Sequence, residues 1–513
     1  MAHQSVGWQK CTKGGCVGIC LATGGKCWAH ADKPDLHAAL KRLGVDGCLD
    51  ARGVPITQEL LARLLAAAPK DDQGHAVLIE ARFDQATFEG DADFVFATFE
   101  NWALFDQATF QGDADFFRAE FQGFAGFDGT TFKRGARFDE ATFQGDAGFG
   151  GASFEHDATF DRANFQQAER LGPVLAYRGL VLDRVQFARP VQIEAAAIGV
   201  CCRGAGFAGG VQFRLRWARV ALDDTDLAAP CILAWIPALA DARLAEQERR
   251  IARAWRRLLG DAISPWPRLL SLRRANVAGL RVAYVDLTDC RFGGAHNLDK
   301  LRFEAEVSFG VAPTHLAWDW RHVTADERAW RAQHARRWTA PTYPEWVDAW
   351  LGQRRPSVME PAQIAGGYRM LRKGREDSKD EPGAADFYYG EMEMRRRAHR
   401  GRTSGASRGR VERGVLTAYW LVSGYGLRAW RALACLLVVI LVGAVGLWAV
   451  GFTGHRQAWS SALLYTAGAV TRLVNPPTGL LTEPGQAIRL VVGLLGPLLL
   501  ALALLALRGR VKR

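Results

Sequence analysis

Three cysteines and a histidine near the N-terminus have the residue types and the spacing of a metal site. The pattern is C-x4-C-x10-C-x2-H, with paired glycines that permit tight turns between the ligands. Thiolates and imidazole suit zinc in a tetrahedral site, and so short a module could not order itself without a metal. We therefore predict a structural zinc. Its predicted ligands are Cys11, Cys16, Cys27 and His30.

The sequence leaves one ligand position open. Cys20 competes for a place in the set, and His37 is a weaker competitor for His30. The alternative is a cluster of reduced cysteines that holds no metal. No nearby carboxylate or open-site pattern accompanies the four residues, so the expected site is closed and structural, not catalytic.

The remaining cysteines indicate a reducing compartment. Ten cysteines in 513 residues are too few and too uneven for a disulfide scaffold. The first ten residues are polar and lack the apolar region of a cleavable signal peptide. We expect most of the chain to stay in the cytoplasm.

Phenylalanine recurs between residues 81 and 168 in alternating steps of five and six residues. An alanine lies two residues before each of them, except that Thr130 precedes Phe132. These steps produce no single stripe on an α-helix, and on a flat strand they would alternate between its faces. A chain that turns a corner every five or six residues places all of them inside. The sixteen residues are Phe83, Phe88, Phe94, Phe99, Phe105, Phe110, Phe116, Phe121, Phe127, Phe132, Phe138, Phe143, Phe149, Phe154, Phe160 and Phe165.

This pattern resembles the pentapeptide-repeat family, whose units read roughly A-(D/N)-(L/F)-x-x. The resemblance implies a mainly β solenoid, a right-handed quadrilateral pentapeptide-repeat β-helix. A strict five-residue version follows at Leu272, Val277, Val282, Leu287 and Phe292. The N-terminal cysteine pattern is also similar to the zinc-knuckle-like start of some members.

The segment 171–312 is interpreted as degenerate continuation of the solenoid with an inserted basic helix at 242–261. Leu244, Ile251, Trp255, Leu258 and Leu259 form an apolar helical face opposite a dense arginine face. Solenoid ends need covering, so we expect this helix to act as a cap. Binding of an acidic partner is the alternative.

Two uncharged apolar runs, 434–452 and 490–507, are long enough to be transmembrane helices. Ten arginines lie in 395–431 against Glu412 alone, and basic residues follow the second run. The positive-inside rule therefore predicts a multi-pass inner (plasma) membrane protein with both termini in the cytoplasm. The arginine-rich segment is expected to bind anionic lipids of the inner leaflet.

A further apolar segment, 459–474, lies between the two runs. Span, short helix and span is the arrangement of two-transmembrane pore modules, and the chain resembles bacterial proteins that fuse pentapeptide repeats to them. Potassium-channel relatives carry a TVGYG-like filter here, whereas 471–475 reads TRLVN, with a cationic Arg472. We expect an anchor, with a channel-like oligomer lacking potassium selectivity as the alternative.

A helical hairpin is predicted over 359–397, with SKDEPG as its turn. A similar Y-x-x-L-(R/K)-K…A-x-x-F-Y-Y-x-E-M segment precedes the membrane part in the bacterial family that the chain resembles. Glu391 and Glu393 are assigned to a charged helix face with no catalytic role.

The predicted organisation has six parts. They are a zinc-knuckle-like module (1–34), a helical linker (35–76), a phenylalanine-rich β-helix (77–170), a degenerate β-helix (171–312), a cytoplasmic helical connector (313–412) and a membrane module (413–513).

The leading functional hypothesis is a membrane-anchored scaffold that binds an unidentified protein partner on the cytoplasmic face, without catalysis. No Gly-rich phosphate loop, HExxH or GxSxG is found in a supporting context. Between 81 and 168, sixteen acidic side chains face six basic ones, a net of −10. Because some soluble pentapeptide-repeat proteins mimic DNA and bind topoisomerases, that activity is a second alternative; no nucleic acid is expected, and a homo-oligomer is left open.

Overall fold

The chain forms two compact units, Met1–Met359 and Glu360–Arg513, in the computed structural model. The boundary between them lies inside the 313–412 segment that the sequence assigns to one connector. The structure describes residues 8–21, 25–259, 264–313, 320–341, 358–398, 406–453, 458–471 and 481–511, without the side chains of 254, 257–259, 406–410 and 507–511.

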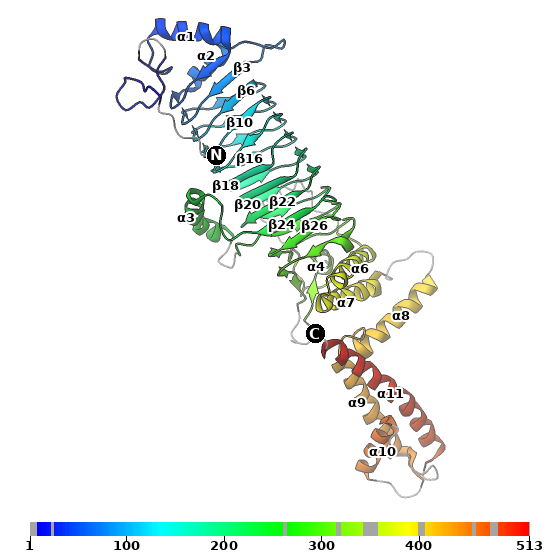
Figure 1. The fold of residues 1–513 in the computed structure, drawn as a ribbon. Helices are drawn as coiled ribbons and strands as arrows, with labels where there is room; N and C mark the ends of the chain where they lie inside the picture. Colours follow the sequence, from blue (N-terminus) through cyan, green and yellow to red (C-terminus); the bar gives the residue numbers. More distant parts are fainter. Residues whose placement is uncertain are drawn as a thin grey trace. The chain divides into compact units, whose positions relative to one another are not determined.

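The first unit is mainly β-structure (Figure 1). It opens with α1 (Lys33–Asp46), β1 (Cys48–Asp50), β2 (Pro55–Ile56) and α2 (Gln58–Ala67). The phenylalanine-rich coils contain β3 (Val77–Arg82), β4 (Thr87–Phe88), β5 (Ala92–Asp93), β6 (Thr98–Leu104), β7 (Thr109–Phe110), β8 (Ala114–Asp115), β9 (Glu120–Phe121), β10 (Phe124–Gly126), β11 (Thr131–Phe132), β12 (Ala136–Arg137), β13 (Thr142–Phe143), β14 (Ala147–Gly148), β15 (Ser153–Phe154), β16 (Ala158–Thr159) and β17 (Asn164–Phe165). Later coils contain β18 (Arg170–Val181), β19 (Gln186–Phe187), β20 (Val191–Cys201), β21 (Gly206–Phe207), β22 (Val211–Arg216), β23 (Arg219–Ala221), β24 (Cys231–Trp235), α3 (Ala242–Leu259), β25 (Arg268–Ser271), β26 (Leu280–Ala283), β27 (Val285–Asp286), η1 (Leu298–Lys300), β28 (Arg302–Phe303) and β29 (Val307–Ser308). The unit ends with β30 (Gly310–Val311), β31 (His322–Val323) and α4 (Ala325–Ala332).

The elements of secondary structure described in the second unit are all helices. Its elements are α6 (Pro361–Asp377), α7 (Glu381–Ala398), α8 (Ala406–Ser423), α9 (Ala429–Gly446), η3 (Leu447–Gly451), α10 (Trp459–Thr471) and α11 (Glu483–Val511).

The phenylalanine-rich coils are twenty-two residues long, which is two eleven-residue repeats. Phe88 pairs in parallel with Phe110, and Phe110 with Phe132, each twenty-two residues further along. One coil therefore contributes four phenylalanines, one to each of four columns. Rings in a column stack 4.3–5.0 Å apart between successive coils, for example Phe88 on Phe110 and Phe94 on Phe116. All sixteen are at most 1% exposed, so the predicted solenoid is confirmed, with four inward faces.

Several later coils shorten to twenty residues. Phe187 pairs with Phe207, and Asp183 binds the backbone N–H of Arg203, both across twenty residues. Four strict five-residue steps make such a coil, as the second spacing pattern predicts. Its five apolar residues, Leu272, Val277, Val282, Leu287 and Phe292, are at most 4% exposed.

Aspartates at the corners connect successive coils. Asp106 Oδ1 accepts a hydrogen bond from the backbone N–H of Asp128 at 2.9 Å, and Asp128 Oδ1 accepts one from Gly150 at 2.6 Å. Burial raises the pKa of the Asp128 carboxyl. Some of the aspartates of these coils therefore accept hydrogen bonds from backbone N–H groups at the corners, which have no partner in a strand.

Gly145 lies where two coils approach closely, and a side chain there has no room. A Cβ on Gly145 would meet the carbonyl oxygen of Gly123 at 2.2 Å. Gly145→Ala is therefore expected to destabilise the solenoid by about 1–3 kcal/mol or more, because the backbone must move. Gly135→Ala is the control, since its Cβ would meet only the Asp113 carboxylate, at 3.2 Å. Urea titration checks the difference, and equal losses in both variants would contradict it.

Helix α3 packs on the side of the solenoid, so the expectation that it caps an end is wrong. Figure 1 shows α3 beside the coils and not at an end of them. Leu244 and Trp255, each 2% exposed, pack with Trp217 and Ile236 of the coils. The reason is that the outer face of the coils here is apolar, with Leu175, Ile198 and Trp217 in the cluster that packs on α3. Ile251 is partly buried against the same cluster, and the side chains of the remaining two predicted contacts, at 258 and 259, lie outside the described residues.

Helix α4 lies over the last coils, where Asp326 Oδ2 accepts the N–H of Phe292 at 2.8 Å. Burial raises the pKa of the Asp326 carboxyl to about 6, against about 4 for an unfolded aspartate. The folded chain thus binds this proton more tightly, so the contribution of Asp326 to the free energy of unfolding falls as pH rises from about 4 to about 7. Asp326→Asn removes that titration. We expect it to stabilise the protein relative to wild type more at pH 8 than at pH 5; denaturant titrations giving the same difference at both pH values would contradict this.

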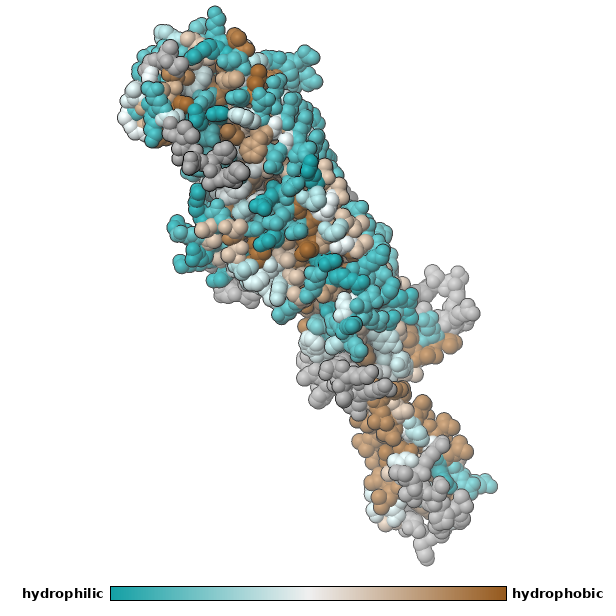
Figure 2. Space-filling view, viewed as in Figure 1, coloured by the Kyte–Doolittle hydropathy of each residue, from teal (hydrophilic) through white to brown (hydrophobic). Residues whose placement is uncertain are grey.

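Two helices of the second unit are long and apolar enough to cross a membrane, by length and composition. These helices are Ala429–Gly451 and Glu483–Ala506, and their most apolar 18-residue windows have mean hydropathies of 2.8 and 2.4. Only 17% and 22% of their most apolar windows are buried, and Figure 2 shows hydrophobic residues covering this region. Helix α10 packs against both: Val470 lies among Leu436 of α9 and Val492 of α11. The residues 472–475, proposed to stand in the place of a filter, lie outside the described residues.

Candidate metal centre

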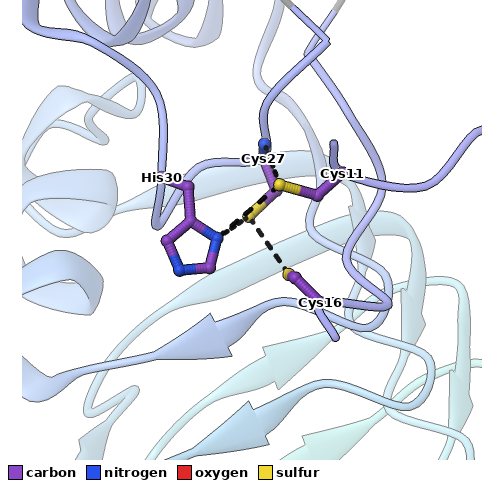
Figure 3. Close-up of side chains that lie close together, drawn as sticks. All are labelled: Cys11, Cys16, Cys27 and His30. Atoms are coloured by element: carbon purple, nitrogen blue, oxygen red, sulfur yellow. Dashed lines mark hydrogen bonds between the residues drawn. The ribbon is translucent and has the colours of Figure 1, made fainter. Parts of the chain in front are cut away.

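The structure brings Cys11, Cys16, Cys27 and His30 together, and their ligand atoms all lie within 4.8 Å of one another (Figure 3). Cys27 Sγ is 3.8 Å from Cys16 Sγ and 3.4 Å from His30 Nδ1, and Cys11 Sγ is 3.6 Å from that nitrogen. Tetrahedral zinc with bonds of about 2.3 Å to sulfur and about 2.1 Å to nitrogen places two sulfurs about 3.8 Å apart and a sulfur about 3.6 Å from a nitrogen. The four residues therefore lie close enough to bind one metal ion.

Two tight turns place the ligands. The backbone N–H of Cys16 donates to Lys13 at 3.1 Å across the turn that contains Gly15, whose φ is +80°. The backbone N–H of His30 donates to Cys27 at 2.9 Å, so both side chains of the C-x2-H pair point to the same side (Figure 3). The first is a glycine-permitted turn of the kind expected from the spacing, whereas the second forms without glycine, and together they are the local cause of the cluster.

The pKa values of the Cys11 and Cys27 thiols are shifted in opposite directions. Burial raises the pKa of Cys11, but hydrogen bonds from the N–H groups of Lys13 and Cys27 and from His30 outweigh it, and the pKa falls to about 6. Burial and the neighbouring Cys16 sulfur raise the pKa of Cys27 to about 12. A bound cation would favour both thiolates, since a coordinating thiol loses its proton.

The two rival ligands lie outside the cluster. Cys20 is not among the residues brought together, and its backbone N–H donates to Gln9 at 3.0 Å. His37 is an exposed residue of α1. Within the described residues, the geometry therefore favours the set that the sequence predicts first.

The module is fastened to the first coil of the solenoid. Trp28, 5% exposed, donates its indole N–H to the backbone oxygen of Asp50 at 2.7 Å, and the N–H of Ile19 donates to Arg52 at 2.8 Å. Because β1 and β2 already pair with β3 and β4, the segment assigned to a helical linker contributes strands to the solenoid. An ordered module would thus cover an otherwise open end of the parallel sheets.

Glu391 is buried, so its assignment to a charged helix face is wrong. It is 1% exposed and lies within 3.1 Å of Arg369, 3.0 Å of Arg372 and 2.5 Å of Arg395. The hairpin packs its acidic residues inward because arginines from both helices surround them. The i and i+4 spacing of Glu391 and Arg395 indicates that they pair on one helix, but it does not indicate burial.

Glu393, 5% exposed, has a similar environment. It accepts hydrogen bonds from Arg396 at 2.9 Å, Arg397 at 3.1 Å and the hydroxyl of Tyr425 at 3.1 Å. Arg431 in turn lies over the ring of Trp420, at 4.8 Å. Several arginines of 395–431 are therefore engaged inside the unit, and Arg413 is a described exposed one.

Sequence reasoning also missed the buried carboxylate that fastens α3. Glu248, 3% exposed, accepts hydrogen bonds from the indole of Trp217 at 2.5 Å and from Arg216 at 2.6 Å. A single glutamate on an arginine-rich helix carries no local signal for this role, because its partners are more than thirty residues away.

The stacked parallel coils and the four-ligand cluster define a β-solenoid with a candidate metal site at its N-terminal end. The protein-family model described as Pentapeptide repeats (9 copies) matches residues 127–169, so this part of the solenoid is built from pentapeptide repeats. Neither a curated protein nor a solved structure matches the chain.

Proposed function

We propose that this protein is a membrane-anchored scaffold on the cytoplasmic face of the inner membrane, and that it acts by binding a protein partner rather than by catalysis. The observation that carries the proposal is that one chain combines a solenoid filled with phenylalanine and two membrane-length helices with outward apolar surfaces. A packed axis leaves no interior site for a substrate, whereas repeated outer faces suit protein contacts.

The test has two parts. Membranes carrying the full chain are washed with alkaline carbonate, and the protein is expected to stay with the lipid. A photo-crosslinking amino acid is then placed at Trp102, which is 46% exposed on the phenylalanine-rich coils, and at Tyr284, which is 42% exposed on a later coil. Reproducible crosslinking of one protein from one of these positions supports the scaffold. Release by carbonate, or no crosslinks from a set of positions covering every outer face, would overturn it.

We also propose that the N-terminal cluster binds structural zinc, held by the four residues named above. Their donor set and spacing support zinc over harder cations, which prefer oxygen ligands. When bound, the metal supplies crosslinks between two turns. Hydrogen bonds of the chain itself, from Trp28 and Ile19, hold the module on the first coil.

A channel-like oligomer is the second candidate function, because the short helix α10 packs against both membrane-length helices, α9 and α11. Conductance in planar bilayers together with an oligomer by native mass spectrometry would favour it. Monomers without conductance would remove it.

Topoisomerase binding has less support, because aspartates such as Asp106 and Asp128 bind backbone donors of the next coil.

We also propose that the arginine-rich segment 395–431 binds anionic lipids and that both termini are cytoplasmic. These proposals rest on the arginines of the segment that lie outside the Glu391 and Glu393 cluster. A reporter fused to the C-terminus tests the proposed cytoplasmic placement.

A further inference from the structure

The connection between α8 and α9 contains three consecutive residues with positive φ. Gly424, Tyr425 and Gly426 follow one another with φ of 53°, 60° and 76°. The left-handed region is open to glycine but strained for a bulky side chain such as tyrosine. Such strain persists only where surrounding contacts hold it, and it concentrates at functional joints.

Contacts from α7 hold this joint. Tyr425 is 1% exposed, and its hydroxyl donates to Glu393 at 3.1 Å. Its ring meets the ring of Tyr389 edge-on at 5.1 Å. Burial and the nearby Glu393 carboxylate raise the pKa of Tyr425, so its hydroxyl stays a donor.

Helix α7 also contacts the chain on both sides of the joint, at the end of α8 and at the start of α9. On α8, the indole of Trp420 donates to the hydroxyl of Tyr389 at 3.0 Å, and Arg396 lies over its ring at 4.6 Å. On the α9 side, Arg428 is 7% exposed and lies over the ring of Tyr389 at 5.5 Å. The α6–α7 hairpin thus contacts the last turn of α8, the joint itself and the start of α9.

A second arrangement of the joint is available to this sequence. Residues 424–428 contain no proline, and both glycines are free to adopt right-handed helical angles. Without the contacts to α7, relief of the strain at Tyr425 favours one continuous helix through α8 and α9.

We propose that residues 424–426 form a two-state joint, bent while the α6–α7 hairpin is docked through Glu393 and Tyr425 and straight when it is not. A partner that displaces the hairpin would then reorient α8 relative to the first membrane-length helix. This would make the second unit a transmitter of movement as well as an anchor. The inference rests on contacts within the second unit and does not depend on the proposed scaffold activity.

The distance between α8 and α9 tests the proposal in the full-length protein in detergent. Spin labels attached to p-acetylphenylalanine at Val415 and Leu437, which are 63% and 57% exposed, leave the native cysteines unmodified. Twenty-two residues of continuous helix separate the two backbone sites by about 33 Å. Wild type is expected to show one shorter distance by double electron–electron resonance. Tyr425→Phe, which removes the hydroxyl, is expected to add a population near the straight-helix value.

Two further variants make the result decisive. Tyr465→Phe is the control, because the hydroxyl of Tyr465 in α10 has no hydrogen-bond partner among the described residues, and it should keep the wild-type distance. Gly424→Ala combined with Gly426→Ala makes the left-handed angles unfavourable, so it should also populate the straight state. If both joint variants keep the single wild-type distance, the proposal is overturned. The same holds if they lose helicity by circular dichroism without a population near the straight-helix value.

Discussion

Replacing Phe127 with alanine is expected to cost the solenoid about 3–5 kcal/mol of stability, because it removes a whole ring from a packed column. Phe127 is 0% exposed, and its ring stacks 4.9 Å from both Phe105 in the coil before and Phe149 in the coil after. A cavity at that point also leaves its two neighbours without a contact on one side. Coils of a solenoid interact mainly with their neighbours, so the loss should be centred on this coil.

Phe124→Ala is the matched control, since it removes the same group three residues earlier. Phe124 is 38% exposed on the outer surface. Its loss should cost about 0.5 kcal/mol or less, as for most surface substitutions. Urea titration of the β-sheet circular dichroism signal of the full chain measures both. Equal shifts in the two midpoints would show that the phenylalanine columns do not carry the stability of the solenoid.

Cys27→Ser is expected to abolish zinc binding and disorder the N-terminal module while leaving the phenylalanine-rich coils folded. Cys27 is 0% exposed, and its sulfur is hydrogen-bonded within the cluster to both Cys16 and His30. Structural zinc contributes about 10–16 kcal/mol of apparent binding free energy in short modules at neutral pH, so the loss of one of four ligands is a large effect. Metal content by plasma mass spectrometry, expected to be one zinc per wild-type chain, and limited proteolysis of residues 8–31 provide the readouts.

Cys20→Ser supplies the control for the zinc prediction. Cys20 is near the cluster in sequence but is not part of it, so this variant should keep its zinc and its resistance to proteolysis. Wild-type protein purified without stoichiometric metal, and unable to take up added zinc, would contradict the assignment. Zinc loss in the Cys20 variant rather than the Cys27 variant would instead show a different ligand set.

The sequence by itself determined the solenoid and the clustering of Cys11, Cys16, Cys27 and His30, because both depend on spacing along the chain. An eleven-residue repeat with two phenylalanines can bury all of them only if two repeats close one coil, which is what Phe88 and Phe110 do. The change to strict fives at Leu272 likewise predicts burial on a shorter coil. The C-x4-C and C-x2-H pairs are local turns, so their spacing alone brings the ligands within reach.

Tertiary structure alone decided the features that depend on residues far apart in the chain. Whether α3 caps an end or lies along a side depended on the contacts of Trp255 and Glu248 with Trp217. In the sequence, Glu391 and Glu393 have the pattern of a charged helix face. Arginines of α6 and α7 enclose Glu391, and arginines of α7 together with Tyr425 enclose Glu393, so partners from elsewhere in the fold stabilise each buried carboxylate. The bent joint at Tyr425 is likewise absent from local propensity, since the contact with Glu393 selects a backbone conformation that tyrosine does not prefer on its own.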